Sequence, residues 1–306
     1  MDIYLHHYPP SLFSEKIRLL LGYLQLPWRS VIIPSIMPRP LLMPLSGGYR
    51  KTPVLQIGAN VYCDSKIIAM ALARHAGDTD LYAQGFTAHR VADWADGTLF
   101  PVTVALNFSP EAVGVMMGSF PPEEAAAFQK DRADLTQGAS ITSFSAQAAG
   151  AYLHHYLSEL DGSIDAGYLF GAAPCIADFA VYHCLWFLGN NPVNAPLLDR
   201  YSAVREWMSR MAAIGHGAME ESDGEAALAA AKSLEPVMPR LVSGLPDGFA
   251  LGDPVAVTPV DYGRVPVTGT MAAWSTDEVV ISRETPETGS LLNHFPTAGF
   301  EVTKSG

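Results

Sequence analysis

The apolar positions of residues 1–80 alternate between two periods. Residues 2–8 place apolar and polar side chains on opposite faces, which is the period of a β-strand. Residues 11–25 repeat their apolar side chains at helical spacing instead. The same patterns predict strands at 28–33, 52–57 and 60–64, a proline-rich loop at 34–48 and a helix at 65–76. This order of strands and helices predicts an α/β unit.

From residue 86 to about 235 the pattern is helical throughout. One stretch, IADFAVYHCLWFL at residues 176–188, is apolar on all sides, so we expect it to form the buried centre of a helical bundle. The predicted helices are 86–107, 121–135, 141–160, 175–189, 197–212 and 222–233.

The last part of the chain returns to strand-like alternation with glycine and proline turns. Four stretches between residues 254 and 304 carry β-branched side chains and predict a small barrel or curved sheet. The expected fold class is α+β multidomain, with an α/β domain, an all-α helical bundle and a small C-terminal β-barrel-like domain. The predicted domains are residues 1–79, 84–238 and 239–306.

Composition narrows the possible functions. The chain has 306 residues, of which 49% are apolar, so it is long enough for about two well-packed domains. Its net charge of −12 is unfavourable for binding the phosphates of nucleic acids. We expect no membrane span, because no apolar run reaches the length of one, and no signal peptide, because the N-terminus has no basic start. Three scattered cysteines suit a reducing cytoplasm rather than a disulfide framework.

Several motifs occur in an order that is similar to one known family. They are SLFSEKIR at 11–18, KTPVL at 51–55, CDSKII at 63–68, APCIADFAVYHCLWFL at 173–188 and YSAVREWMSRMAAIGHG at 201–217. Over residues 1–217 the chain resembles the glutathione S-transferase superfamily. The resemblance implies a thioredoxin-like first domain, a helical second domain and a homodimer. It also implies an enzyme that conjugates glutathione, as co-substrate, to a hydrophobic electrophile.

The resemblance implies that Ser11 is the catalytic residue. The N-terminus of a helix favours an anion such as a thiolate, and a hydroxyl that donates to sulfur lowers the pKa of the thiol further. The alternative is that Ser11 is only a helix N-cap, worth about 1 kcal/mol. Disulfide exchange is excluded at Ser11 and Ser14, which stand where redox relatives have two cysteines. Tyr4 and Tyr8 are competing hydroxyls, and Tyr8 is the stronger alternative.

The resemblance also implies which residues hold glutathione. The backbone around Thr52, Pro53 and Val54 would pair with the cysteinyl part if the Thr-Pro peptide is cis. Asp64 would meet the ammonium group of the γ-glutamyl end, and Ser65, at a helix N-terminus, its carboxylate. Lys51, or alternatively Arg50, would meet the glycyl carboxylate. The simpler interpretations are that Pro53 only starts an edge strand and that Asp64 and Ser65 form an ordinary N-cap.

The resemblance places the electrophile between the first two domains. Trp94, Phe100 and Asn107 are the candidates for this pocket, together with Tyr8, and the loop 34–48 is a candidate wall. Aromatic residues at helical spacing are also typical of plain core. No metal site is expected, since His6 and His7 point to opposite faces of a strand.

Two further readings stay open. The chain could bind glutathione without turnover, as a carrier or a regulatory scaffold. The C-terminal β module could bind a protein or shield the pocket, although its Trp274, His294 and Phe295 are equally typical of packing residues. Cys175 stands where the family has a hydroxyl in a capping box with Asp178, so the cap at this helix should be weakened.

Overall fold

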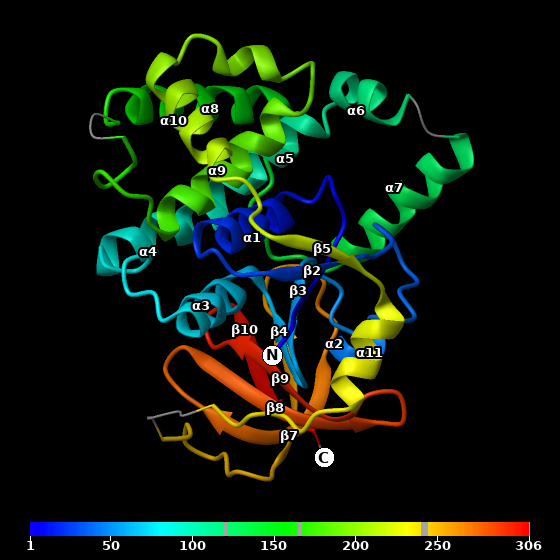
Figure 1. Ribbon diagram of the computed structural model, residues 1–306. Coiled ribbons are helices and arrows are strands. Elements are labelled where there is room, and N and C mark those ends of the chain that lie inside the picture. Colours follow the sequence, from blue (N-terminus) through cyan, green and yellow to red (C-terminus); the bar gives the residue numbers. More distant parts are fainter. Residues whose placement is uncertain (119–120, 165–166, 240–243, 306) are drawn as a thin grey trace.

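The computed structural model describes residues 1–118, 121–164, 167–239 and 244–305 (Figure 1). The first part of the chain forms the predicted α/β unit, and its predicted strands and helices are confirmed. The proline-rich loop contains one short helix. The elements are β1 (Ile3–His7), α1 (Leu12–Tyr23), β2 (Trp28–Ile32), α2 (Met43–Ser46), β3 (Val54–Ile57), β4 (Asn60–Cys63) and α3 (Ser65–Ala76).

The helical part lies over one face of this unit (Figure 1). Its central helix α9 is buried almost along its whole length, as its apolar sequence predicts. The predicted helix 86–107 is interrupted by a π-helical turn, η1, and α6 was not predicted. The elements are α4 (Gly85–Trp94), η1 (Ala95–Leu99), α5 (Phe100–Asn107), α6 (Pro110–Met117), α7 (Pro122–Thr136), α8 (Ala146–Asp161), α9 (Ile176–Gly189), η2 (Ala195–Leu198) and α10 (Ser202–Ala213).

The segment predicted as the last bundle helix, 222–233, is different in the structure. Strand β5 (Met219–Ser222) pairs in parallel with β2, and helix α11 (Gly224–Lys232) follows it. α11 buries Ala227 and Ala231 in a hydrophobic core that it shares with α2 and the C-terminal strands. The chain therefore leaves the helical bundle before α11 begins.

The C-terminal strands continue the N-terminal sheet instead of forming a separate barrel. β9 pairs in parallel with β4, with Val61 opposite Asn293, and the ten strands run in the order β10-β6-β7-β8-β9-β4-β3-β1-β2-β5. The pairing covers the edge of β4, whose backbone groups would otherwise be open. The α+β fold class is confirmed. The new strands are β6 (Pro254–Pro259), β7 (Val267–Trp274), β8 (Glu278–Thr285), β9 (Gly289–Pro296) and β10 (Phe300–Lys304).

Two large hydrophobic cores lie on the faces of this sheet. One joins α1 and α3 to the helical bundle, and the other joins α2, α11 and the strands β6 to β9. Packing was one interpretation of Trp274 and Phe295 from the sequence, and both residues belong to the second core. Within the described residues no single helix is long and apolar enough to cross a membrane; the bent pair Gly85–Asn107 and Pro110–Met117 meets that test only when taken together.

Candidate functional site

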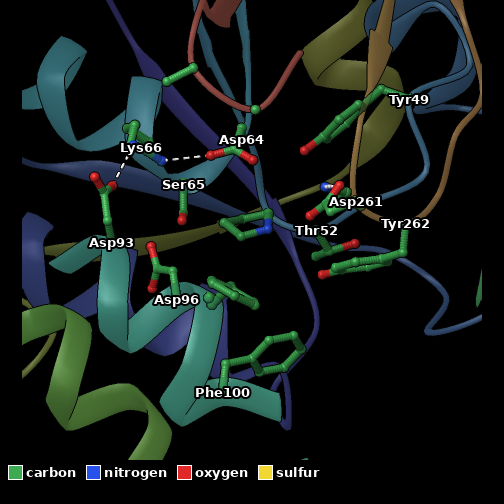
Figure 2. A pocket seen from close by; sticks show the side chains of 16 residues that line it. Tyr49, Thr52, Asp64, Ser65, Lys66, Asp93, Asp96, Phe100, Asp261 and Tyr262 are labelled. Carbon is green, nitrogen blue, oxygen red and sulfur yellow. Dashed lines mark hydrogen bonds and ion pairs between the residues drawn. The ribbon is translucent and has the colours of Figure 1, made fainter. Parts of the chain in front are cut away.

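All three parts of the chain contribute to one cavity of about 260 Å³ (Figure 2). It lies where the start of α1, the start of α3 and the π-helical turn meet two turns of the C-terminal strands. Its lining comprises Phe13, Tyr49, Lys51, Thr52, Pro53, Asp64, Ser65 and Lys66 from the α/β unit, Asp93, Asp96, Gly97 and Phe100 from the bundle, and Asp261, Tyr262, Ala298 and Gly299 from the C-terminal part.

One side of the cavity is formed by the loop before β3. The Thr52–Pro53 peptide is cis, as the motif KTPVL led us to expect. The hydroxyl of Thr52 accepts a hydrogen bond of 3.0 Å from the buried guanidinium of Arg39, which also donates to the carbonyl of Arg50 at 2.8 Å. Arg39 therefore fixes the loop that presents Thr52 and Pro53 to the cavity.

Next to this loop lies the N-terminus of α3, because Val54 of β3 pairs with Cys63 of β4. Asp64 is the N-cap, because its carboxylate accepts a hydrogen bond of 2.9 Å from the backbone N–H of Lys66. Its backbone φ is +106°, a conformation that residues other than glycine rarely adopt. Burial raises the pKa of the Asp64 carboxyl, and the nearby ammonium of Lys51 lowers it only in part. Ser65 is the first residue of this helix, where backbone N–H groups have no acceptor within the helix itself. This end of the cavity thus offers a carboxyl group and an anion-binding helix terminus next to each other.

The floor carries a buried ion pair centred on Asp96. Its carboxylate accepts from the ammonium of Lys16 at 2.8 Å and from Nε2 of His183 at 3.0 Å. Burial alone would raise the pKa of Asp96, but these two partners outweigh it and lower the pKa to about 2. Burial lowers the pKa of His183, so its imidazole is neutral and donates to a permanent carboxylate. Asp96 therefore ties α1 and α9 to the π-helical turn.

Lys51 is already paired inside the cavity. Its Nζ donates to Asp261 at 2.5 Å and lies 4.4 Å from the centre of the Tyr262 ring. Asp261 and Tyr262 belong to the turn between β6 and β7. The ammonium of Lys51, which the resemblance assigned to the glycyl carboxylate of glutathione, is therefore already paired with the carboxylate of Asp261 in the C-terminal part.

Two phenol groups face the cavity from this side, as Figure 2 shows. The Tyr49 ring is almost completely buried, and its hydroxyl has no hydrogen-bond partner within the described residues. Burial raises the pKa of Tyr49 and of Tyr262, so both phenols remain protonated near neutral pH. Each hydroxyl can therefore donate a hydrogen bond to a bound molecule.

The structure brings together some of the predicted site residues. Lys51, Thr52, Pro53, Asp64, Ser65 and Phe100 all line the cavity. Ser11 does not, although Phe13, two residues later, does. The Oγ of Ser11 accepts hydrogen bonds from the N–H and the hydroxyl of Ser14, at 3.3 and 2.9 Å, which is the predicted N-cap.

Four other predicted residues lie outside the cavity. Val54 is fully buried in β3, and Tyr8 lies against the second core, with its ring 6.0 Å from the guanidinium carbon of Arg39. Trp94 packs edge-on against Tyr156. Asn107 is buried: it donates to the carbonyl of Phe187 at 2.7 Å and accepts from Asn194 at 2.7 Å. These contacts give Trp94 and Asn107 packing roles within the bundle.

Sequence reasoning missed the contribution of the C-terminal part. Asp261 and Tyr262 lie in the stretch PVDYG, which reads as an ordinary turn between two strands. The only local signal is an aromatic residue between an acid and a glycine. Its place in the cavity depends on the pairing of β9 with β4, which joins residues more than two hundred positions apart.

Comparisons with known proteins agree with this architecture. Residues 5–80 match the family model of the glutathione S-transferase N-terminal domain, and residues 143–210 that of the C-terminal domain. A GST-like protein from Pseudomonas syringae has a similar structure, with 38% identity, a TM-score of 0.83, and coverage of 99% of this chain and 100% of its own. The comparison with curated proteins gives no match.

More distant solved structures share the fold over about two thirds of the chain. A glutathione transferase family member from Pseudomonas fluorescens, solved with two glutathione molecules bound, has 14% identity and a TM-score of 0.52, with 69% of this chain and 88% of its own covered. FzlA from C. crescentus has 18% identity and a TM-score of 0.51, with 69% and 88% covered. At these identities the likeness concerns the fold alone.

Proposed function

Because the chain belongs to the glutathione S-transferase superfamily, we propose that it binds glutathione in this cavity and conjugates it to an electrophilic small molecule. One observation carries the proposal. The cavity combines the Thr52–Pro53 cis peptide with Asp64 and Ser65 at the N-terminus of α3. An extended tripeptide with an ammonium and a carboxylate at one end matches these groups.

The γ-glutamyl end lies at α3 in this proposal. Asp64 pairs with the ammonium, and the hydroxyl of Ser65 and the N-terminus of α3 bind the carboxylate. The cysteinyl part lies along the backbone of Thr52, Pro53 and Val54, as a strand would. The glycyl carboxylate meets Lys51, which keeps its bond to Asp261.

The sulfur points to the N-terminus of α1. The backbone N–H and the hydroxyl of Ser14 both donate to the oxygen of Ser11. The proton of the Ser11 hydroxyl therefore remains available for donation to the sulfur. A charge-assisted hydrogen bond from Ser11 and the N-terminal dipole of α1 would both favour the thiolate. The hydrophobic electrophile then approaches past Phe13 and Phe100, which lie 4.9 Å apart in an edge-to-face contact.

A carrier that binds glutathione without turnover is the second candidate. The observation in its favour is the set of residues Asp261, Tyr262, Ala298 and Gly299, which cover the cavity from the C-terminal side. In either role we propose a cytoplasmic homodimer, in which the C-terminal part shields the bound peptide.

Calorimetric titration with glutathione tests binding, and assays with a panel of electrophiles test turnover. We expect the full-length protein to bind glutathione and to lower the pKa of its thiol. Asp64→Asn should weaken binding about tenfold or more through the lost ammonium pair, whereas the exposed Asp80→Asn should leave it unchanged. Absence of binding would refute the proposal, and binding without turnover would favour the carrier.

Ser11→Ala separates the two readings of Ser11. We expect glutathione still to bind and its thiol pKa to rise by about one unit. If the pKa stays the same while the protein becomes less stable, Ser11 acts only as the cap of α1.

A further inference from the structure

We propose that Tyr262, from the turn between β6 and β7, donates a hydrogen bond to the sulfur of the bound thiol and so helps to hold the thiolate. This inference rests on the proposed glutathione site. It would make the C-terminal part, which lies outside the two matched family domains, a source of a catalytic residue.

Tyr262 lies near the end of the cavity where the sulfur is expected. Phe13 is the second residue of α1, so it marks the end of the cavity where the sulfur is expected. Its ring contacts Phe100 at 4.9 Å between centres, and the ring of Tyr262 lies 6.4 Å from that of Phe100. In Figure 2 the hydroxyl of Tyr262 points into the cavity, on the side of Thr52 and Phe100. The three rings thus form an aromatic wall that carries a single hydroxyl.

The hydroxyl of Tyr262 is protonated, and its ring is held in place by neighbouring groups. Burial and the carboxylates of Asp261 and Asp64 raise the pKa of the phenol, so it keeps its proton as a donor. Lys51 lies 4.4 Å from the centre of the ring and is itself held by Asp261 at 2.5 Å. The ring is therefore fixed before any ligand binds, which reduces the entropy lost when the hydrogen bond forms.

The other hydroxyls at the cavity are less well placed to reach the sulfur beside Phe100. Thr52 already accepts from Arg39, and Ser65 lies at the α3 end with Asp64. The ring of Tyr49 packs on Phe295 and Phe300 of the C-terminal strands. Ser11, the donor proposed above, lies at the N-terminus of α1 and does not itself line the cavity, so a second donor can act beside it. Tyr262 is the lining hydroxyl that adjoins Phe100. In the reaction the thiol proton passes to solvent, the phenol stays neutral, and its O–H stabilises the sulfur anion until the sulfur attacks.

Tyr262→Phe tests the inference, because it removes the hydroxyl and keeps the ring. The measurement is the thiolate absorbance of bound glutathione as a function of pH, together with titration by S-methylglutathione, which has no thiol. We expect the thiol pKa to rise by about one unit, and the rate with an electrophile near neutral pH to fall several-fold. The affinity for S-methylglutathione should not change.

Each result has one reading. An unchanged thiol pKa in Tyr262→Phe overturns the inference and leaves the glutathione site standing. A lower affinity for S-methylglutathione with an unchanged pKa gives Tyr262 a role only in shaping the cavity, which also overturns it. If the wild-type protein binds no glutathione, the proposed function fails as well. Tyr262→His is a second variant in case Tyr262→Phe does not fold. The ring N–H of histidine is a hydrogen-bond donor, so this variant should restore part of the pKa shift that Tyr262→Phe loses.

Discussion

At the scale of single residues, Asp96 shows how a partly buried carboxylate stays charged when two side chains, Lys16 and His183, donate to it. Its folded-state pKa of about 2 lies below the ordinary value of 3.8, so the ion pair stabilises the folded protein fully above about pH 4 and loses this effect as pH falls through 2. We expect Asp96→Asn to lower the free energy of unfolding by about 2 kcal/mol at pH 7. Denaturant unfolding at several pH values measures this. A variant that shows the same loss at pH 2 as at pH 7 would contradict the assignment.

Tyr49 illustrates the opposite case, a buried hydroxyl that has no hydrogen-bond partner among the residues that the structure describes. A buried hydroxyl that makes no hydrogen bond costs about 1–3 kcal/mol. We therefore expect Tyr49→Phe to leave the melting temperature of the ligand-free protein unchanged or to raise it. Tyr201→Phe is the matched control, because the hydroxyl of Tyr201 is 2.9 Å from Nδ1 of His154, and its loss should lower the melting temperature. Equal losses in the two variants would mean that the hydroxyl of Tyr49 has a stabilising partner.

At the scale of elements, the start of α9 combines a strong hydrogen-bond acceptor, the carboxylate of Asp178, with a weak one, the sulfur of Cys175. The carboxylate of Asp178 accepts from the backbone N–H of Leu169 and Cys175, both at 2.9 Å, and from the indole of Trp207 at 2.8 Å. The sulfur of Cys175 faces the N–H of Asp178, but sulfur is a poor acceptor. Asp178 thus holds α9 to α10 and to the preceding turn, as well as capping the helix.

Cys175→Ser should therefore improve this cap. A serine oxygen in place of sulfur completes the capping box and should raise the free energy of unfolding by about 0.5–1 kcal/mol. Cys184→Ser is the control, because Cys184 is buried in the middle of α9 and has no helix terminus to cap. Thermal unfolding compares the two variants. Stabilisation in both, or in neither, would argue against a capping effect.

The elements also show what the sequence can predict. The strands and helices of residues 1–76 and the buried α9 follow from local periodicity. β5 does not, because its sequence MEES is mostly exposed and has no alternation. The cis peptide and the α3 terminus are encoded in short motifs, so the sequence alone indicates Thr52, Pro53, Asp64 and Ser65, and all four line the cavity. The cavity also depends on contacts distant in sequence, which explains why Asp261 and Tyr262 were missed.

At the scale of the whole molecule, a buried polar network joins the C-terminal strands to the α/β unit. Glu278, on β8, accepts from Nδ1 of His294 at 2.6 Å and from Arg74 of α3 at 2.8 Å. His294 stacks on Tyr62 and lies 2.8 Å from the side-chain amide of Asn60, both on β4. This network spans the junction of β4 and β9, so the two parts of the sheet should unfold together.

Glu278→Ala tests this coupling. The carboxylate of Glu278 is 1% exposed, and removing it leaves His294 and Arg74 without their acceptor, which should cost about 3 kcal/mol. The control is Glu284→Ala, on the same strand but exposed, which should change stability little.

Burial would raise the pKa of Glu278, but His294 and Arg74 outweigh it and lower the pKa, so wild-type stability should fall in acid as this carboxyl protonates. The variant should lose part of that pH dependence. Because Asp261 and Tyr262 follow β6 of this sheet, Glu278→Ala should also weaken glutathione binding. A variant with wild-type binding and two separate unfolding transitions would show that the C-terminal strands are an independent unit.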